Sequence, residues 1–137
     1  MILDLSAGKI NELDKYNLEK ITELVITFNN LKNIDKIINK CINLQKLNCS
    51  FNNLTSLPAE LLHSLQILNC SCNQLTSLPT ELPHSLQSLD CSNNQLTSLP
   101  AELPHSLQEL HCDGNKLTSL PISIINCRRL RHISYSS

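Results

Sequence analysis

The sequence is poor in aromatic residues and in glycine. Among its 137 residues, tryptophan is absent, phenylalanine and tyrosine occur twice each, and only two glycines are present. A chain of this length suits one domain with a continuous core. Because aromatic residues make up 3% of the chain, we expect that core to consist of leucine, isoleucine and cysteine, of which there are seven.

Basic residues are missing from the middle of the chain. No lysine or arginine occurs between residues 47 and 115, a segment that carries six acidic residues. The whole chain has a formal net charge of −1 and a pI near 6.5, so it lacks an overall field that would attract nucleic acid or an anionic membrane. Lysines precede the acidic segment, and after it come Lys116, Arg128, Arg129 and Arg131. This distribution disfavours nucleic-acid binding and makes the centre acidic between more basic ends.

Signals for membrane insertion or secretion are also missing. The chain has no apolar run of roughly 18 residues, the length that spans a membrane. Its first residues, Met-Ile-Leu-Asp-Leu-Ser, lack the basic and apolar regions of a signal peptide. An odd number of cysteines without such a signal fits a reducing compartment better than a disulfide framework. We therefore expect a soluble cytoplasmic protein that has no contact with membranes.

The dominant feature of the sequence is a repeat of 21 residues, with two units of 23. Four nearly identical copies begin at Leu44, Leu65, Leu86 and Leu107, and each has the form L-x-x-L-x-C-x-x-N-x-L followed by T-S-L-P. Two divergent units precede them and a half unit follows. We predict one domain over 1–137, with repeats at about 2–20, 21–43, 44–64, 65–85, 86–106 and 107–129 and a partial repeat at 130–137.

This tandem pattern resembles the leucine-rich-repeat family over essentially the whole chain. The T-S-L-P segments and the Leu-Pro that follows them are similar to short repeats of bacterial effectors. The cysteine in L-x-C and the phrase Asn-Gln-Leu-Thr-Ser-Leu-Pro are similar to repeats encoded by giant DNA viruses of amoebae, which would place the protein in the host-cell cytoplasm. The resemblance implies an α/β-type solenoid, mostly β, in which a right-handed horseshoe carries a parallel sheet of about seven strands on its concave face. It also implies that this sheet binds a protein partner.

Alternation along each short strand assigns residues to the interior. One inward column consists of leucines and ends at Ile133, and the neighbouring column ends at Tyr135. The second column contains four cysteines that point the same way, so we predict them to be reduced, buried and structural rather than in disulfides or bound to zinc. They are Cys49, Cys70, Cys91 and Cys112. Cys72, in another column, is the cysteine expected to be partly exposed.

An asparagine recurs at the point where each turn leaves the strand. A buried amide there would pair with backbone groups, which predicts a structural role for this column. Its members are Asn29, Asn52, Asn73, Asn94 and Asn115. The prolines that follow argue against α-helix on the convex side, where we predict extended and 3₁₀ segments. The two 23-residue units lack the second proline, so each is expected to hold a single helical turn.

Two patterns could carry chemistry, and each has a simpler interpretation. His63, His84 and His105 form a column, but no carboxylate or thiol recurs within a residue or two, so an exposed column is favoured over a metal site. Asp90, His111 and Ser134 fall on three adjacent strands and invite a hydrolase interpretation. No glycine-rich elbow or helix terminus supplies an oxyanion hole. We therefore predict no catalytic residue, no metal and no cofactor.

The outward strand positions form the surface on which we expect binding. This face is polar and mildly acidic, and we predict that the groups converging near its centre contact a basic surface of a protein partner. These groups belong to Asn48, Asn69, Asp90, His111 and Asp113. No tryptophan, tyrosine or arginine occupies the centre of the face, whereas tight interfaces usually depend on such anchors. The predicted affinity is accordingly modest.

The ends of the repeat array suggest an alternative function. A solenoid needs capping units, because a terminal turn exposes one side of the core and a row of unpaired strand groups. The first predicted strand begins at Ile2 and the last ends two residues before the end of the chain, so neither end is expected to have a polar cap. The alternative is a structural repeat unit that forms a weak homodimer through Leu130, Ile133 and Tyr135.

Overall fold

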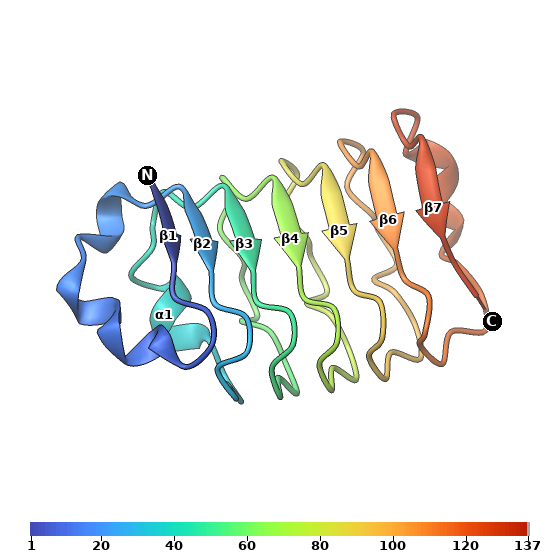
Figure 1. The fold of residues 1–137 in the computed structure, drawn as a ribbon. Coiled ribbons are helices and arrows are strands. Elements are labelled where there is room, and N and C mark those ends of the chain that lie inside the picture. The colour runs from blue at the N-terminus through green and yellow to red at the C-terminus, as the bar shows by residue number, and fades with distance from the viewer. Residues whose placement is uncertain (137) are drawn as a thin grey trace.

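The computed structural model describes residues 1–136 as a stack of turns with one parallel sheet along one side (Figure 1). The sheet has seven strands in chain order, so each strand pairs with the strands of the preceding and following turns. The predicted solenoid with a seven-stranded parallel sheet is confirmed. Its strands are β1 (Ile2–Asp4), β2 (Glu23–Val25), β3 (Lys46–Asn48), β4 (Ile67–Asn69), β5 (Ser88–Asp90), β6 (Glu109–His111) and β7 (His132–Ser134).

The register of the sheet aligns equivalent positions of all seven turns. The middle residue of each strand, Leu3 in β1 through Leu110 in β6 to Ile133 in β7, pairs with the middle residue of the next strand. These side chains point into the stack and are buried in the first six turns. The residues on either side point outward, because side chains alternate along a strand. The register therefore produces one apolar interior and one outward face made of equivalent positions.

Asparagine amides connect consecutive turns inside the stack. Nδ2 of Asn94 donates to the carbonyl oxygens of Cys70, Cys91 and Ser92 at 3.1, 3.1 and 3.2 Å, and its Oδ1 accepts from the backbone N–H of Leu75 at 3.0 Å. The same pattern recurs in the neighbouring turns. Within the described residues, every buried side-chain nitrogen or oxygen has a hydrogen-bond partner. One amide per turn thus satisfies backbone groups that a sharp turn would otherwise leave unpaired.

The convex side contains little regular structure. Turns and bends connect the strands between residues 49 and 108, where five of the six prolines lie. The two 23-residue units contain α1 (Asp35–Ile38) and the 3₁₀ helix η3 (Ile122–Asn126), at the places where single helical turns were expected. Two further 3₁₀ helices, η1 (Lys9–Lys15) and η2 (Leu18–Lys20), occur in the first unit, for which the sequence analysis predicted no helix. The first unit lacks proline, so nothing in it opposes helical turns.

The two ends of the stack differ in how well their core is covered. At the amino end, Leu3 and Leu5 are 6% and 1% exposed, because the loop with η1 and η2 folds over the first turn and buries Leu13 and Leu18 (Figure 1). The expectation of an uncovered core is wrong at this end. At the carboxyl end, Ile133 is 41% exposed. The apolar surface of the last turn is therefore the one that lacks a cover among the described residues.

Candidate protein-binding surface

The concave face carries a row of side chains whose orientation is fixed. In Asn48, Asn69 and Asp90, Oδ1 accepts from both the backbone N–H and the hydroxyl of the serine two residues later. For Asp90 and Ser92 these distances are 3.1 Å to the nitrogen and 2.6 Å to Oγ. The other polar atom of each side chain has no hydrogen-bond partner among residues 1–136. A row of two amides and one carboxylate is thus held in place with one polar atom each left for another molecule.

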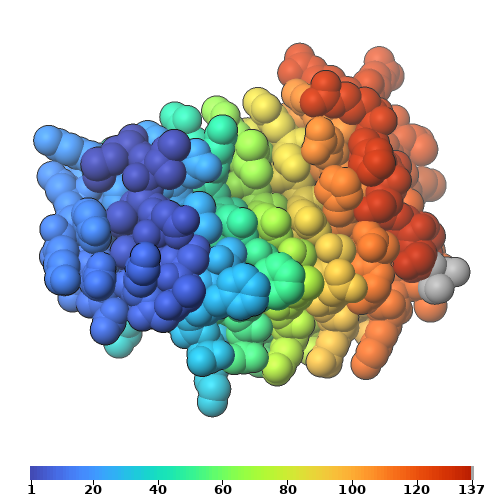
Figure 2. All heavy atoms as spheres, viewed as in Figure 1, coloured from blue at the N-terminus to red at the C-terminus, as the bar shows by residue number. Residues whose placement is uncertain are grey.

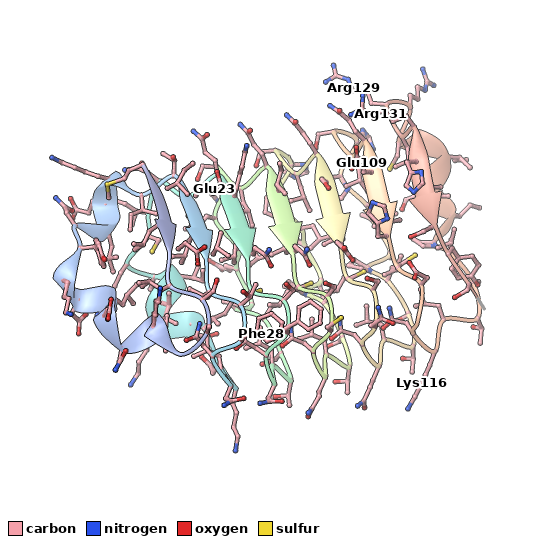
Figure 3. All side chains as sticks on the ribbon, viewed as in Figure 1. Glu23, Phe28, Glu109, Lys116, Arg129 and Arg131 are labelled. Atoms are coloured by element: carbon pink, nitrogen blue, oxygen red, sulfur yellow. The ribbon has the colours of Figure 1, made fainter. Side chains whose placement is uncertain are left out.

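A charged cluster continues this row on β6 and β7. Oγ of Ser134 donates to Oδ1 of Asp113 at 2.6 Å, and this hydrogen bond is the main reason that the pKa of Asp113 lies below its ordinary value. Nδ1 of His111 lies 3.1 Å from the same hydroxyl oxygen. Glu109 contacts Arg131 at 3.4 Å, and the two lie close together at one end of the face (Figure 3). Asp113 therefore carries its negative charge throughout the neutral range.

The three residues of the hydrolase interpretation do not form a relay in this structure. His111 and Ser134 are in contact, but Asp90 bonds to Ser92 instead of to His111. The hydroxyl of Ser134 donates to Asp113, so its proton is directed to a carboxylate of lowered pKa, which is a weak base. Nucleophilic activation requires the histidine to accept that proton while the acid orients the histidine. These contacts favour a structural role for the cluster.

The cysteines are free thiols, and six of the seven are buried. Burial raises the pKa of Cys49 to about 12 and that of Cys112 to about 11, and it also raises the pKa values of Cys70 and Cys91. Cys72 is half-buried. Within the described part of the chain, no group of three or more histidine, cysteine or acidic side chains is arranged to hold a metal ion. The histidine column, His63, His84 and His105, is exposed.

The structure also places two side chains together that the sequence analysis assigned no role. Phe28 and Phe51, the only phenylalanines, stack with ring centroids 4.7 Å apart and planes at 13°. They are 59% and 49% exposed, and both have φ of 55°. Equivalent positions in later turns hold Asn93 and Gly114, residue types that tolerate positive φ. In the sequence, only Asn93 and Gly114 indicated that the residues of this column adopt a left-handed backbone conformation as the chain leaves the sheet.

Comparisons with known proteins agree with this architecture. A family model described as "Leucine Rich repeats (2 copies)" matches residues 42–84 and 84–121. Among solved structures, the chain is similar to the leucine-rich-repeat domain of a Shigella effector (31% identity, TM-score 0.79, 93% of this chain and 54% of that one). It is also similar to YopM from Yersinia enterocolitica WA-314, with 33% identity and a TM-score of 0.65 over 85% of this chain and 23% of YopM. A leucine-rich-repeat protein of Leptospira interrogans shares 33% identity, with a TM-score of 0.63 over 96% of this chain and 39% of that one.

These similarities cover only part of the related chains, since this sequence spans about half of the Shigella domain and less of the other two. A search of curated proteins gave no significant match. None of the helices among residues 1–136 has the length and apolar character that a membrane crossing requires.

Proposed function

Because the chain belongs to the leucine-rich-repeat family, whose members generally act as scaffolds for protein–protein interaction, we propose that it binds a protein partner through the concave face of its sheet. The observation that carries this proposal is the fixed row of Asn48, Asn69 and Asp90, which leaves one polar atom of each side chain unpaired. Pre-oriented polar groups lose little entropy on binding. The row and the neighbouring Asp113 are acidic overall, so the proposed partner presents a basic surface there. Binding without catalysis is the activity assigned to this chain.

Charge reversal on the concave face tests the proposal. We expect Asp90→Lys with Asp113→Lys to abolish the capture of proteins that the intact chain retains from a lysate of the natural host. The matched control is Glu60→Lys with Glu102→Lys, which makes the same change in net charge at exposed positions on the convex side. Unchanged capture by the concave variant, or equal loss by both variants, would move the binding site away from the concave face.

The proposed location is a reducing cytoplasm, which for a viral protein is that of the host cell. All seven cysteines are free, and the concave row needs no disulfide to hold it. Alkylation in denaturant at the moment of lysis, followed by intact mass measurement, should add seven labels without prior reduction, because unfolding exposes the six buried thiols. Fewer labels would indicate disulfide formation and an oxidising compartment.

A second candidate function is self-association through the carboxyl-terminal turn. Ile133 is 41% exposed, Leu130 and Tyr135 are half-buried, and a shallow hollow of about 520 Å³ lies among Leu130, Ile133 and neighbouring side chains of the last turn. Apolar side chains at an unpaired sheet edge favour association with a second copy. Ile133→Lys should abolish any concentration-dependent rise in mass, because a charge there cannot be buried against another apolar edge.

A further inference from the structure

We propose that Phe28 and Phe51 anchor the partner, and that they bind an extended segment in which an apolar side chain lies about three to five residues before or after a lysine or arginine. This inference rests on the proposed function, since it adds an anchor and a partner chemistry to the same concave face. The two rings form the anchor site, and the acidic residues farther along the sheet bind the basic side chain.

The first argument is that the turn does not require phenylalanine at these positions. Both residues adopt a φ of 55°, a conformation that is unfavourable for bulky L-residues. Asn93 has a φ of 53° at the equivalent position, so the same turn forms without an aromatic side chain. About half of each ring remains exposed to water instead of entering the core. An arrangement that costs stability and leaves apolar surface exposed is typical of a binding site.

The second argument is the shape and rigidity of the pair. The backbone N–H of Phe28 donates to the carbonyl of Phe51 at 3.1 Å, which fixes one residue against the other. The stacked rings stand between short side chains in the same column, Ala7 on one side and Cys72 on the other. Figure 3 shows Phe28 on the loop that leaves β2, at the edge where the strands end. In the same view, Figure 2 shows the successive turns packed side by side from the amino-terminal to the carboxyl-terminal end. Exposed aromatic side chains are enriched at protein interfaces, so a rigid aromatic pair fits the role of an anchor.

The third argument is the distance from the pair to the acidic residues. Neighbouring strands lie about 4.8 Å apart, so Asp90 on β5 and Asp113 after β6 are about two and three strand spacings from Phe51, roughly 10 and 15 Å. An extended segment that crosses the strands advances about 3.3 Å per residue, which gives the proposed separation of about three to five residues. No lysine or arginine occurs between residues 47 and 115 to oppose a basic side chain.

Synthetic peptides provide the probe. Three fluorescent peptides of identical composition would each carry one phenylalanine and a Lys-Arg pair, separated by about one, four or eight serine or glycine residues to bracket the distance estimated from strand spacing. Binding to the full chain is measured by fluorescence anisotropy. We expect the peptide of intermediate spacing to bind about tenfold or more tightly than the short one, which cannot span the two sites, and about threefold more tightly than the long one, whose spacer exceeds the span. The intermediate peptide should also slow alkylation of Cys72, which follows Phe51 in the column.

The decisive variant is Phe28→Asn with Phe51→Asn, which introduces the residue that the chain already uses at Asn93. We expect about tenfold or greater loss of binding to the intermediate peptide, with no loss of resistance to urea. Tyr16→Asn with Ile42→Asn is the matched control, since it also removes two exposed apolar side chains, 41% and 54% exposed, and should leave binding unchanged. Spacing-independent binding, binding by none of the peptides, or full binding by the phenylalanine variant would overturn the proposal.

The charge-reversal variant separates this inference from the proposed function. If Asp90→Lys with Asp113→Lys abolishes capture of lysate proteins while Phe28→Asn with Phe51→Asn captures them normally, the anchor is wrong and concave-face binding stands. If both variants capture normally, both proposals fail. Loss of capture and of peptide binding by both variants, with the controls unaffected, supports both.

Discussion

In each of the first six turns, the third residue after the strand has a left-handed backbone. Its φ is 56° at Ala7, 55° at both phenylalanines, 54° at Cys72, 53° at Asn93 and 68° at Gly114. Since L-residues other than asparagine and glycine are strained there, the identity of this residue should set the local stability without changing the turn. A side chain in this column can therefore be exchanged without changing the turn, and each exchange should alter the stability.

Exchanging residues within the column tests that statement. We expect Phe51→Asn to raise the free energy of unfolding by about 1 kcal/mol, because asparagine tolerates the left-handed region. The reciprocal change, Asn93→Phe, should lower it by a similar amount. Urea unfolding followed by circular dichroism would measure both. The hypothesis requires that the two substitutions change the free energy of unfolding in opposite directions. A loss of stability in Phe51→Asn would show that the stacked rings stabilise the fold by more than the backbone strain destabilises it.

The asparagine column makes a larger contribution per residue. Asn94 is buried and pairs with four backbone groups, so Asn94→Ala leaves buried N–H and carbonyl groups unpaired. We expect a loss of roughly 3 kcal/mol in the free energy of unfolding. The exposed neighbour Gln95 provides the control, since Gln95→Ala should change stability by less than about 0.5 kcal/mol. Similar effects of both substitutions in urea unfolding would contradict this assignment.

At the level of elements, the structure of the regular repeats could be predicted from the sequence more completely than that of the divergent first unit. The strands and the asparagine column followed from four aligned copies, in which equivalent positions identify one another. The first unit has no close copy, and its 3₁₀ helices depend on Leu13 and Leu18 packing over the first turn, a contact that periodicity does not encode. The stacked phenylalanines were not predicted for a related reason. Hydropathy assigns a residue to core or surface, but only the backbone conformation shows that two outward residues in adjacent turns face each other.

The cysteine column predicts how stability depends on pH. Burial raises the pKa of Cys49 to about 12 and that of Cys112 to about 11, whereas unfolded thiols ionise near pH 8.5. Above about pH 8.5 the unfolded chain therefore loses protons that the folded chain keeps, and the free energy of unfolding falls as pH rises. Below that pH the contribution is fully present. The column thus stabilises the fold only while its thiols stay protonated.

Replacing the column with valine tests this dependence. In urea unfolding between about pH 7 and 10, the intact chain should lose stability with rising pH, whereas the variant with valine at Cys49, Cys70, Cys91 and Cys112 should lose much less. Cys72→Asn, at a half-buried position where the equivalent residue of the next turn is Asn93, is the control and should keep the pH dependence of the intact chain. The same slope in the intact chain and the four-valine variant would assign the alkaline loss to other groups.

For the whole molecule, the difference between its ends limits how copies can associate. The amino-terminal turn covers its own core, whereas the carboxyl-terminal turn leaves Ile133 exposed beside the edge of β7 that no strand of residues 1–136 pairs with. Association from head to tail would need two complementary ends and could continue into filaments. Association through one exposed end is closed by a two-fold axis and stops at two copies. The proposed self-association therefore yields a dimer in which two β7 edges meet.

Salt should strengthen that dimer. Arg128 and Arg129 are exposed in the last turn, so a two-fold contact brings like charges of two copies together. The Debye length falls from about 10 Å at 0.1 M salt to about 3 Å at 1 M, which screens this repulsion while apolar contacts persist. Binding of a basic partner to Asp90 and Asp113 should weaken over the same range. The opposite salt dependences distinguish the two proposed surfaces in one preparation.

Light scattering across about a hundredfold range of concentration, at low and high salt, measures the dimer directly. We expect the mass to rise with concentration, more steeply at high salt, and the rise to disappear in Ile133→Lys. Ile42→Lys is the matched control, because it places the same charge at another exposed isoleucine, 54% exposed, in the second unit and should leave the rise intact. A constant monomer mass under all conditions would exclude the dimer, and growth beyond two copies would show that the amino-terminal turn also takes part.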